Sequence, residues 1–220
     1  MARTPLSSEV EVPTSQGPAR VRLSEPAGRS VGRLVLGHGA GGGVDAPDLL
    51  AVRVAAVAAG WEVALVVQPW KVAGRRVATA PARLDAAWTE VLRALPAGGP
   101  LVVGGRSAGA RVACRTAADL DAVGVCCLAF PLHPPGRPDR SRAGELPDDR
   151  PVLVVQGRRD PFGSPDDVRA AAPRGRAEVE VVAVDGNHAL AADPDAVAGA
   201  VVAWLQRLRN TPGRGGVRTG

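Results

Sequence analysis

Six short apolar runs that alternate with helical stretches constrain the fold of this chain more strongly than any other feature of its sequence. The runs are rich in valine and mostly uninterrupted by polar residues, as is typical of parallel strands that are buried on both faces. They lie at residues 33–36, 61–67, 100–104, 122–129, 151–156 and 178–184. Helical stretches are expected at residues 47–59, 81–95, 108–119, about 165–172 and 194–209. This alternation predicts an α/β protein with one doubly wound sheet.

Two shorter segments precede these runs, at residues 9–12 and 20–23, and both alternate between apolar and polar residues. Between them, residues 15–18 have the turn-like sequence SQGP, so the pair predicts an antiparallel hairpin. The longest irregular segment, residues 131–150, is too short and too rich in proline to form a second domain. We therefore expect a mostly parallel twisted sheet with an N-terminal antiparallel hairpin, helices on both faces, and minimal or no cap.

The same segments predict the limits of the folded part. One α/β domain is expected over residues 9–209, preceded by a flexible N-terminus at residues 1–8. Residues 210–220 lack the apolar side chains that would anchor them to a core, so a disordered tail is expected there.

The composition argues against several classes of function. The formal net charge is +5, but the chain has four Trp, two Phe, no Tyr and no basic helix or finger motif, so we expect no nucleic-acid partner. Without a signal-like start or an apolar stretch of about 20 residues, a soluble cytoplasmic protein with no membrane partner is expected. Cys114, Cys126 and Cys127 lack the paired spacing of metal ligands, so no metal is expected, and the oligomeric state is left open.

Residues 105–109 have the sequence Gly-Arg-Ser-Ala-Gly and lie between the apolar run 100–104 and the helical stretch 108–119. A G-x-S-x-G in this strand–turn–helix setting is the pattern of a nucleophile elbow, in which the turn holds the serine hydroxyl above the sheet. The flanking glycines leave room for the neighbouring strand and helix, and the helix N-terminus points toward developing negative charge. Ser107 is therefore the candidate nucleophile, and the alternative is a serine that only caps the helix.

A serine hydroxyl needs a base to take its proton, and in this pattern an acid and then a histidine follow after later strands. Asp160 follows the run 151–156, and His188 follows the run 178–184. Open α/β sheets gather their sites at these C-terminal strand ends. We predict His188 as the base and Asp160 as the acid that orients it. The alternative acids are Asp139, Asp166 and Asp167, whereas Asp185 is expected to shape the turn before His188.

Residues 34–43, with the sequence LVLGHGAGGG, admit two interpretations. Three of the glycines match the G-x-G-x-x-G fingerprint of dinucleotide-binding folds, which follows the first strand and needs an acidic residue about 20 residues later. Here two strands are expected to come first, and the next apolar run ends in Gln-Pro-Trp. A glycine-rich loop can also donate a backbone N–H to an oxyanion. We predict Ala40 and Ala108 as the two donors, with Gly41 as the alternative to Ala40, and no cofactor.

These motifs resemble the α/β-hydrolase superfamily over about residues 9–209. Six segments in order resemble more closely a small capless family that is related to dienelactone hydrolases and includes mammalian testis-expressed and NSL acetyltransferase-complex subunits. The segments are LGHGAGGG, PWKVAGRRVATAPARL, GGRSAGARVA, FPLHPPGRP, QGRRDPFG and GNHAL. The resemblance implies Ser107, Asp160 and His188 as the catalytic triad. Ser107 departs from dienelactone hydrolases proper, whose nucleophile is a cysteine.

The expected function is hydrolysis of an ester or thioester of a small soluble substrate through an acyl-enzyme on Ser107. The alternatives are a non-catalytic binding or scaffold protein with this fold, and an acyltransferase.

Further side chains are candidates for contact with the substrate. Guanidinium groups suit carboxylates and phosphates, so Arg75 and Arg76 are candidate substrate-binding residues, with ion pairing inside loops as the alternative. His133 is a third candidate, with a structural hydrogen bond as its alternative. Arg106 is expected to bind backbone carbonyls or an acidic side chain instead of the substrate. A shallow pocket is expected between residues 40–45, 70–78 and 131–140.

Overall fold

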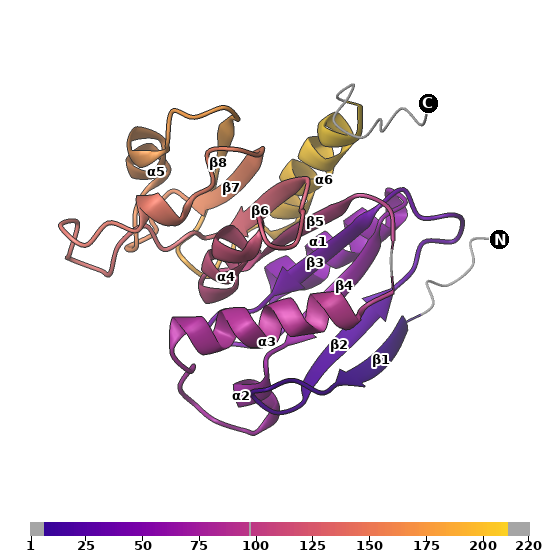
Figure 1. The fold of residues 1–220 in the computed structure, drawn as a ribbon. Coiled ribbons are helices and arrows are strands. Elements are labelled where there is room, and N and C mark those ends of the chain that lie inside the picture. Colours follow the sequence, from indigo (N-terminus) through magenta and orange to yellow (C-terminus); the bar gives the residue numbers. More distant parts are fainter. Residues whose placement is uncertain (1–6, 97, 211–220) are drawn as a thin grey trace, which may run out of the picture.

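The computed structural model describes residues 7–96 and 98–210. Within these residues, eight strands form one sheet in the order β1-β2-β4-β3-β5-β6-β7-β8 (Figure 1). The strands are β1 (Ser7–Val12), β2 (Ala19–Ser24), β3 (Arg33–Gly37), β4 (Glu62–Val67), β5 (Leu101–Arg106), β6 (Gly124–Leu128), β7 (Val152–Gly157) and β8 (Val179–Val184). The helices are α1 (Pro47–Ala58), α2 (Pro69–Val72), α3 (Pro81–Ala94), α4 (Ala108–Thr116), η1 (Ala143–Glu145), α5 (Pro165–Ala171) and α6 (Pro194–Asn210).

The pairing of the strands confirms the predicted fold class. β1 pairs with β2 and β2 with β4 in antiparallel fashion, whereas the pairs from β4 through β3, β5, β6 and β7 to β8 are all parallel. The sheet is therefore mostly parallel, with an antiparallel hairpin at its N-terminal edge. Between β6 and β7, where the sequence is irregular, the chain forms only the single turn η1 and no cap domain.

The predicted limits need two small corrections. Ser7 and Ser8 pair with Ser24 and Leu23, so the hairpin begins inside the segment that was predicted to be flexible. An edge strand pairs through its backbone, so the polarity of these two serines does not prevent it. Asn210 likewise still belongs to α6. The remainder of the predicted N-terminus and tail, residues 1–6 and 211–220, lies outside the described residues.

Two hydrophobic cores lie on opposite faces of the sheet. Helices α3 and α4 cover one face, and α1 and α6 cover the other (Figure 1). One core packs α3 and α4 against strand residues such as Val103 and Cys127. The other packs α1 and α6 against strand residues such as Val102 and Cys126. Neighbouring strand residues belong to different cores because successive side chains on a strand point to opposite faces. Five of the six apolar runs are therefore buried on both faces, as predicted. The prediction is wrong for the run at residues 178–184, because β8 is the edge strand of the sheet and is only partly buried.

The parallel pairing places the C-terminal ends of β3, β5, β7 and β8 at one edge of the sheet. The loops that leave these ends carry residues 38–43, Ser107, Asp160 and His188. The topology alone thus brings residues from distant parts of the sequence to one edge, where sites of open α/β sheets are found.

Local signals for the helices were partly correct. Pro47 lies in the first turn of α1, where proline is favoured, but the nearby Asp45 does not cap this helix, whose N-cap is Ala46. Asp45 forms an ion pair with Arg22 on β2 instead. The sequence also did not indicate α2 and η1, because a single turn is too short to show helical periodicity. Among the described helices, none has the length and hydropathy that crossing a bilayer requires.

Candidate active site

Ser107 lies at the sharp turn between β5 and α4, with φ 53° and ψ −108°. Left-handed φ values cost a residue with a side chain steric energy, and they persist where the surrounding structure enforces them. Here a backbone hydrogen bond helps to hold this conformation, because the Ser107 N–H donates to the Leu128 carbonyl of β6 at 2.9 Å. The backbone therefore has the geometry of a nucleophile elbow.

Two glycines make this turn sterically possible. A Cβ at Gly105, whose φ is +153°, would lie 2.5 Å from the Gly37 carbonyl oxygen of β3. A Cβ at Gly109, in the first turn of α4, would lie 2.6 Å from the carbonyl carbon and oxygen of Gly37. The elbow thus packs directly on the β3 backbone, and both glycines of the G-x-S-x-G are required by that contact.

We predict that Gly109→Ala lowers the free energy of unfolding by about 2 kcal/mol or more, because its methyl group would overlap rigid backbone of β3. Gly199→Ala on α6 is the matched control, since a Cβ there meets no atom within 4 Å. The control should leave stability unchanged or raise it by up to about 1 kcal/mol, because alanine favours a helix interior. Denaturant titration measures both changes, and equal effects of the two substitutions would contradict the packing argument.

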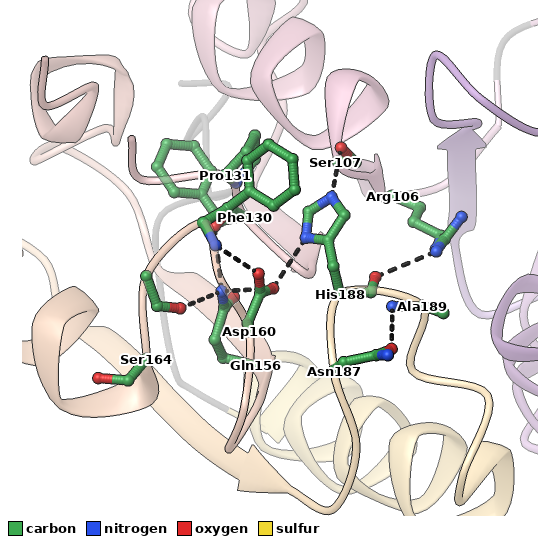
Figure 2. Close-up of polar contacts among 12 residues, drawn as sticks. Arg106, Ser107, Phe130, Pro131, Gln156, Asp160, Ser164, Asn187, His188 and Ala189 are labelled. Carbon is green, nitrogen blue, oxygen red and sulfur yellow. Dashed lines mark hydrogen bonds and ion pairs between the residues drawn. The ribbon is translucent and has the colours of Figure 1, made fainter. Parts of the chain in front are cut away.

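The structure brings the three predicted residues together (Figure 2). The Ser107 Oγ lies 2.8 Å from His188 Nε2, and His188 Nδ1 lies 2.8 Å from Asp160 Oδ2. Ser107 occupies the N-cap position of α4, yet its side chain makes no capping hydrogen bond. Its hydroxyl faces the imidazole instead of the helix.

Asp160 is buried and held as an acceptor by three donors. Besides His188, the side-chain amide of Gln156 donates to Oδ2 at 2.9 Å, and the Phe162 N–H donates to Oδ1 at 2.8 Å. The Phe162 ring also packs on the imidazole of His188, with 4.2 Å between the ring centroids. These hydrogen bonds hold the Asp160 side chain in a single orientation. Asp160 and the Phe162 ring together fix the plane of the His188 imidazole.

Sequence reasoning missed the role of Gln156. Its Nε2 also lies within hydrogen-bond distance of the carbonyls of Phe130 (3.1 Å) and Gly163 (2.8 Å), so it ties β7 to the loops around Asp160. A fully buried polar residue at the end of an otherwise apolar strand was the available signal, because buried amides need partners.

The alternative acids lie in other environments. Asp139 pairs with Arg137, Asp166 pairs with Arg169, and Asp185 pairs with Arg158. Asp167 forms a capping box with Ser164 at the start of α5. None of these four is hydrogen-bonded to the imidazole of His188 in the part of the chain that the structure describes, where that contact belongs to Asp160.

The glycine-rich loop after β3 is organised by His38. Its Nε2 accepts the backbone N–H of Gln68 at 3.2 Å, so the proton of the neutral ring is on Nδ1, which donates to the Gly39 carbonyl at 2.9 Å. That carbonyl shares a peptide unit with the Ala40 N–H, and in a trans peptide the two groups point in opposite directions. His38 therefore sets the orientation of the Ala40 N–H.

Burial lowers the pKa of His38 below its ordinary value of 6.5. The unfolded chain therefore binds a proton that the folded chain does not, and stability is lost as the pH falls below that value. We predict that the free energy of unfolding drops more steeply between pH 7 and about pH 5.5 in the wild type than in His38→Gln. Denaturant titrations at both pH values test this, and parallel slopes in the two proteins would contradict it.

Both predicted oxyanion donors line one small cavity beside Ser107. The cavity has a volume of about 10 Å³, and its walls include Ala40, Ala108, Trp70 and Trp88. This volume is too small for a deep tunnel at this position. Of the segments predicted to form a pocket, residues 40 and 70–78 contribute to this cavity and residues 131–140 do not. The apolar face of α3 takes that place, with Leu84 beside Trp88.

The three candidate substrate-binding residues lie outside this hydrogen-bonded group. Arg75 and Arg76 are exposed in the loop between α2 and α3, and neither side chain forms an ion pair with another described residue. His133 is tied to its own loop, since its Nδ1 donates to the Pro134 carbonyl and its backbone N–H donates to the Phe162 carbonyl. Contact of these residues with a substrate stays a prediction.

Arg106 contacts a backbone carbonyl and an acidic side chain, as the sequence analysis predicted. Its Nη2 donates to the carbonyl of His188 at 3.0 Å, and its Nε lies 3.2 Å from Oδ2 of the buried Asp48. The three cysteines are buried, and Cys114 Sγ and Cys127 Sγ lie 3.4 Å apart in the core behind α4.

Comparison with known proteins agrees with this architecture. The family model described as an alpha/beta hydrolase domain matches residues 30–199. No curated protein matches the sequence significantly.

Among solved structures, a serine hydrolase without lid from Xanthomonas campestris has a TM-score of 0.74 at 20% identity, covering 97% of this chain and 100% of its own. A serine hydrolase homologue from Coxiella burnetii has a TM-score of 0.75 at 18% identity, covering 93% of this chain and 98% of its own. A dienelactone hydrolase from Anabaena variabilis has a TM-score of 0.74 at 20% identity, covering 93% of this chain and 99% of its own. At these sequence identities, the three structures show that the fold is shared.

Proposed function

The chain belongs to the alpha/beta hydrolase domain family, and we propose that it is a serine hydrolase that cleaves an ester or thioester of a small soluble substrate. One observation carries the proposal: Ser107, His188 and Asp160 form a continuous hydrogen-bonded chain with two links of 2.8 Å. Nucleophile, base and orienting acid in this arrangement are what acyl transfer through a serine requires.

The proposed reaction begins when the imidazole of His188 takes the hydroxyl proton as Ser107 Oγ attacks the carbonyl carbon of the substrate. The resulting tetrahedral intermediate collapses when the imidazolium gives its proton to the leaving alkoxide or thiolate, and the acyl group stays on Oγ. A water molecule then attacks the acyl-enzyme with His188 as base again, which releases the carboxylic acid and restores the serine.

Asp160 is proposed to hold His188 in the tautomer that this reaction needs. As an acceptor for Nδ1–H, it leaves Nε2 without a proton and directed at Ser107 Oγ. The Gln156 and Phe162 donors keep both carboxylate oxygens acting as acceptors. The carboxylate also stabilises the imidazolium that forms in the transition state.

The negative charge of the tetrahedral intermediate is proposed to be bound by the N–H groups of Ala40 and Ala108. Both residues line the cavity beside Ser107, and neither N–H has an acceptor among the described residues. The Ala108 N–H belongs to the first turn of α4, where helix N–H groups lack intrahelical partners and carry partial positive charge. The cavity that Ala40 and Ala108 line is mostly apolar, with His38 and Gln68 among its walls.

A fluorophosphonate probe tests the proposed chemistry. It should label the protein stoichiometrically, and mass spectrometry of the digest should place the label on Ser107. Absence of labelling, or a label on another serine such as Ser164, would contradict the proposal and favour a non-catalytic binding protein. If the protein is labelled and forms an acyl-enzyme from p-nitrophenyl esters but releases acid only slowly in water, transfer to another acceptor is favoured.

Arg75 and Arg76 are proposed to favour substrates with a negatively charged group. We predict that Arg75→Gln/Arg76→Gln raises KM about fivefold for a p-nitrophenyl ester with a carboxylate on its acyl chain, since an exposed ion pair contributes about 1 kcal/mol or less. KM for neutral p-nitrophenyl acetate should not change. Arg93→Gln, on an exposed part of α3, is the control for loss of charge alone. Equal KM changes for both esters would refute a charge-specific contact.

A further inference from the structure

We propose that Arg106, paired with the buried Asp48, is a positioning residue that holds the Ser107 and His188 segments at the separation their reaction requires. This role rests on the proposed serine hydrolase function. Arg106 directly precedes the nucleophile in the chain, and its side chain reaches the loop that carries the base, so one residue links the two reacting groups by a route separate from their own hydrogen bond.

The contact of Arg106 with the His188 loop fixes one peptide unit from both ends. Nη2 of Arg106 donates to the His188 carbonyl at 3.0 Å, while the Ala189 N–H of the same peptide donates to Asn187 Oδ1 at 2.9 Å (Figure 2). With both ends held, this peptide cannot rotate without breaking a hydrogen bond. The backbone that precedes the peptide carries the imidazole, so the clamp limits how far Nε2 can move from Ser107 Oγ.

The other side of the guanidinium faces Asp48, in the first turn of α1. Nε lies 3.2 Å from Asp48 Oδ2, and the Asp48 side chain is completely buried. Among the described residues no side chain donates a hydrogen bond to this carboxylate. The backbone N–H groups of Asp48 and Leu49 act on it, and the guanidinium is the charge that compensates it. Burial raises the pKa of Asp48, and the Arg106 charge opposes that effect. Asp48 thus anchors Arg106 to a helix that packs on the far face of the sheet.

The glycine-rich loop also packs against Arg106. A Cβ at Gly39 would lie 3.7 Å from Nη1 of Arg106, and a Cβ at Gly42 would lie 3.8 Å from the same atom. The guanidinium of Arg106 therefore lies against three segments. They are the loop that carries His188, the glycine-rich loop that carries the proposed oxyanion donor, and the first turn of α1. All three surround the nucleophile elbow from which the side chain extends.

A buried ion pair is a weak source of stability, because desolvation of the two charges offsets most of their attraction. Apolar residues of similar size can often replace such a pair without loss of stability. Its location among three active-site segments therefore indicates that its contribution is to geometry. If Arg106 and Asp48 only stabilise the fold, substitutions should lower kcat only when they also lower the melting temperature. If they position the reacting groups, kcat should fall even in a variant that keeps the wild-type melting temperature.

The test uses the double variant Asp48→Leu/Arg106→Met, which removes both charges, beside Arg106→Met, which leaves Asp48 uncompensated. We expect the single variant to melt clearly lower than the wild type and the double variant to melt close to it. Both should have kcat at least tenfold lower on a p-nitrophenyl ester, with KM changed less than twofold. Arg106→Lys should restore the melting temperature but only part of kcat, because one ammonium cannot reproduce both contacts of the guanidinium fork.

Wild-type kcat in a double variant with wild-type stability would overturn the positioning role. Asn187→Ala, at an exposed position of the His188 loop, keeps the test decisive if the double variant does not fold. It removes the other end of the clamp, so we expect a severalfold lower kcat at an unchanged melting temperature, and an unchanged kcat would overturn the proposal.

A readout that needs no turnover separates this proposal from the proposed function. The His188 Nδ1 proton, hydrogen-bonded to Asp160, should give a downfield proton resonance in the wild type that broadens in the positioning variants. If the wild type takes no fluorophosphonate label, the hydrolase proposal fails, yet this resonance still reports whether Arg106 holds the imidazole. A resonance equally sharp in all variants would overturn the positioning role alone.

Discussion

Ser107→Ala is expected to lower kcat for ester hydrolysis by about a millionfold, the loss seen when the nucleophile of a serine triad is removed. The hydroxyl oxygen is the atom that forms the acyl-enzyme, and among the described residues it is the side-chain oxygen hydrogen-bonded to His188 Nε2, at 2.8 Å. Because the Ser107 side chain makes no capping hydrogen bond in α4, its removal should change stability little. The loss should therefore be in chemistry and not in folding.

Steady-state kinetics on p-nitrophenyl esters, with melting temperatures measured in parallel, test this expectation. Ser164→Ala is the matched control, since it removes the N-cap hydrogen bond of α5. The control should cost about 1 kcal/mol of stability and leave kcat unchanged. If Ser107→Ala keeps the turnover of the wild type on every ester that the wild type cleaves, the hydrolysis does not pass through this serine.

Asp160→Asn is expected to lower kcat by about ten-thousandfold, as in other triads in which the acid becomes an amide. The two oxygens of Asp160 accept from His188, Gln156 and Phe162. An asparagine has one oxygen, so its NH₂ group must face at least one of these donors. The imidazole can then adopt the wrong tautomer, with the proton on the nitrogen that should act as base.

The matched control is Asp185→Asn, because Asp185 lies three residues before His188, is exposed and pairs with Arg158. It should retain nearly the full kcat. Asp160→Asn should in addition lose about 1–3 kcal/mol of stability, because a buried donor loses its acceptor. Similar losses of kcat in both variants would mean that the acid has been assigned to the wrong carboxylate.

Much of the fold was predictable because its signals are local. Valine-rich runs such as those that became β5 and β7 predict buried strands wherever they occur, and Pro165 and Pro194 begin helices by their own conformational preference. The glycines around Ser107 predicted a sharp turn for the same reason. Since open α/β sheets place the C-terminal ends of parallel strands at one edge, the positions of Asp160 and His188 after later strands were sufficient to bring them toward Ser107.

Local signals fail where a contact depends on how distant elements pack. Nothing near Asp48 in the sequence indicates that its carboxylate faces Arg106, because α1 and the elbow meet only through the sheet. The walls of the cavity beside Ser107 depend on packing in the same way. They include Trp88 and Leu84 of α3, and nothing near these residues in the sequence indicates that contact.

The sequence by itself therefore determined the succession of the strands and the longer helices along the chain, the strained turn at Ser107 and the identity of the three residues that meet there. Each of these depends on a periodicity or a backbone preference within a few residues. Only the tertiary structure decided what surrounds them: the three donors on Asp160, the tautomer of His38, and the guanidinium that joins the Ser107 and His188 segments. Hydrogen bonds and ion pairs depend on ångström-scale distances between segments far apart in the chain, and such distances are set only when the whole sheet and its helices have packed.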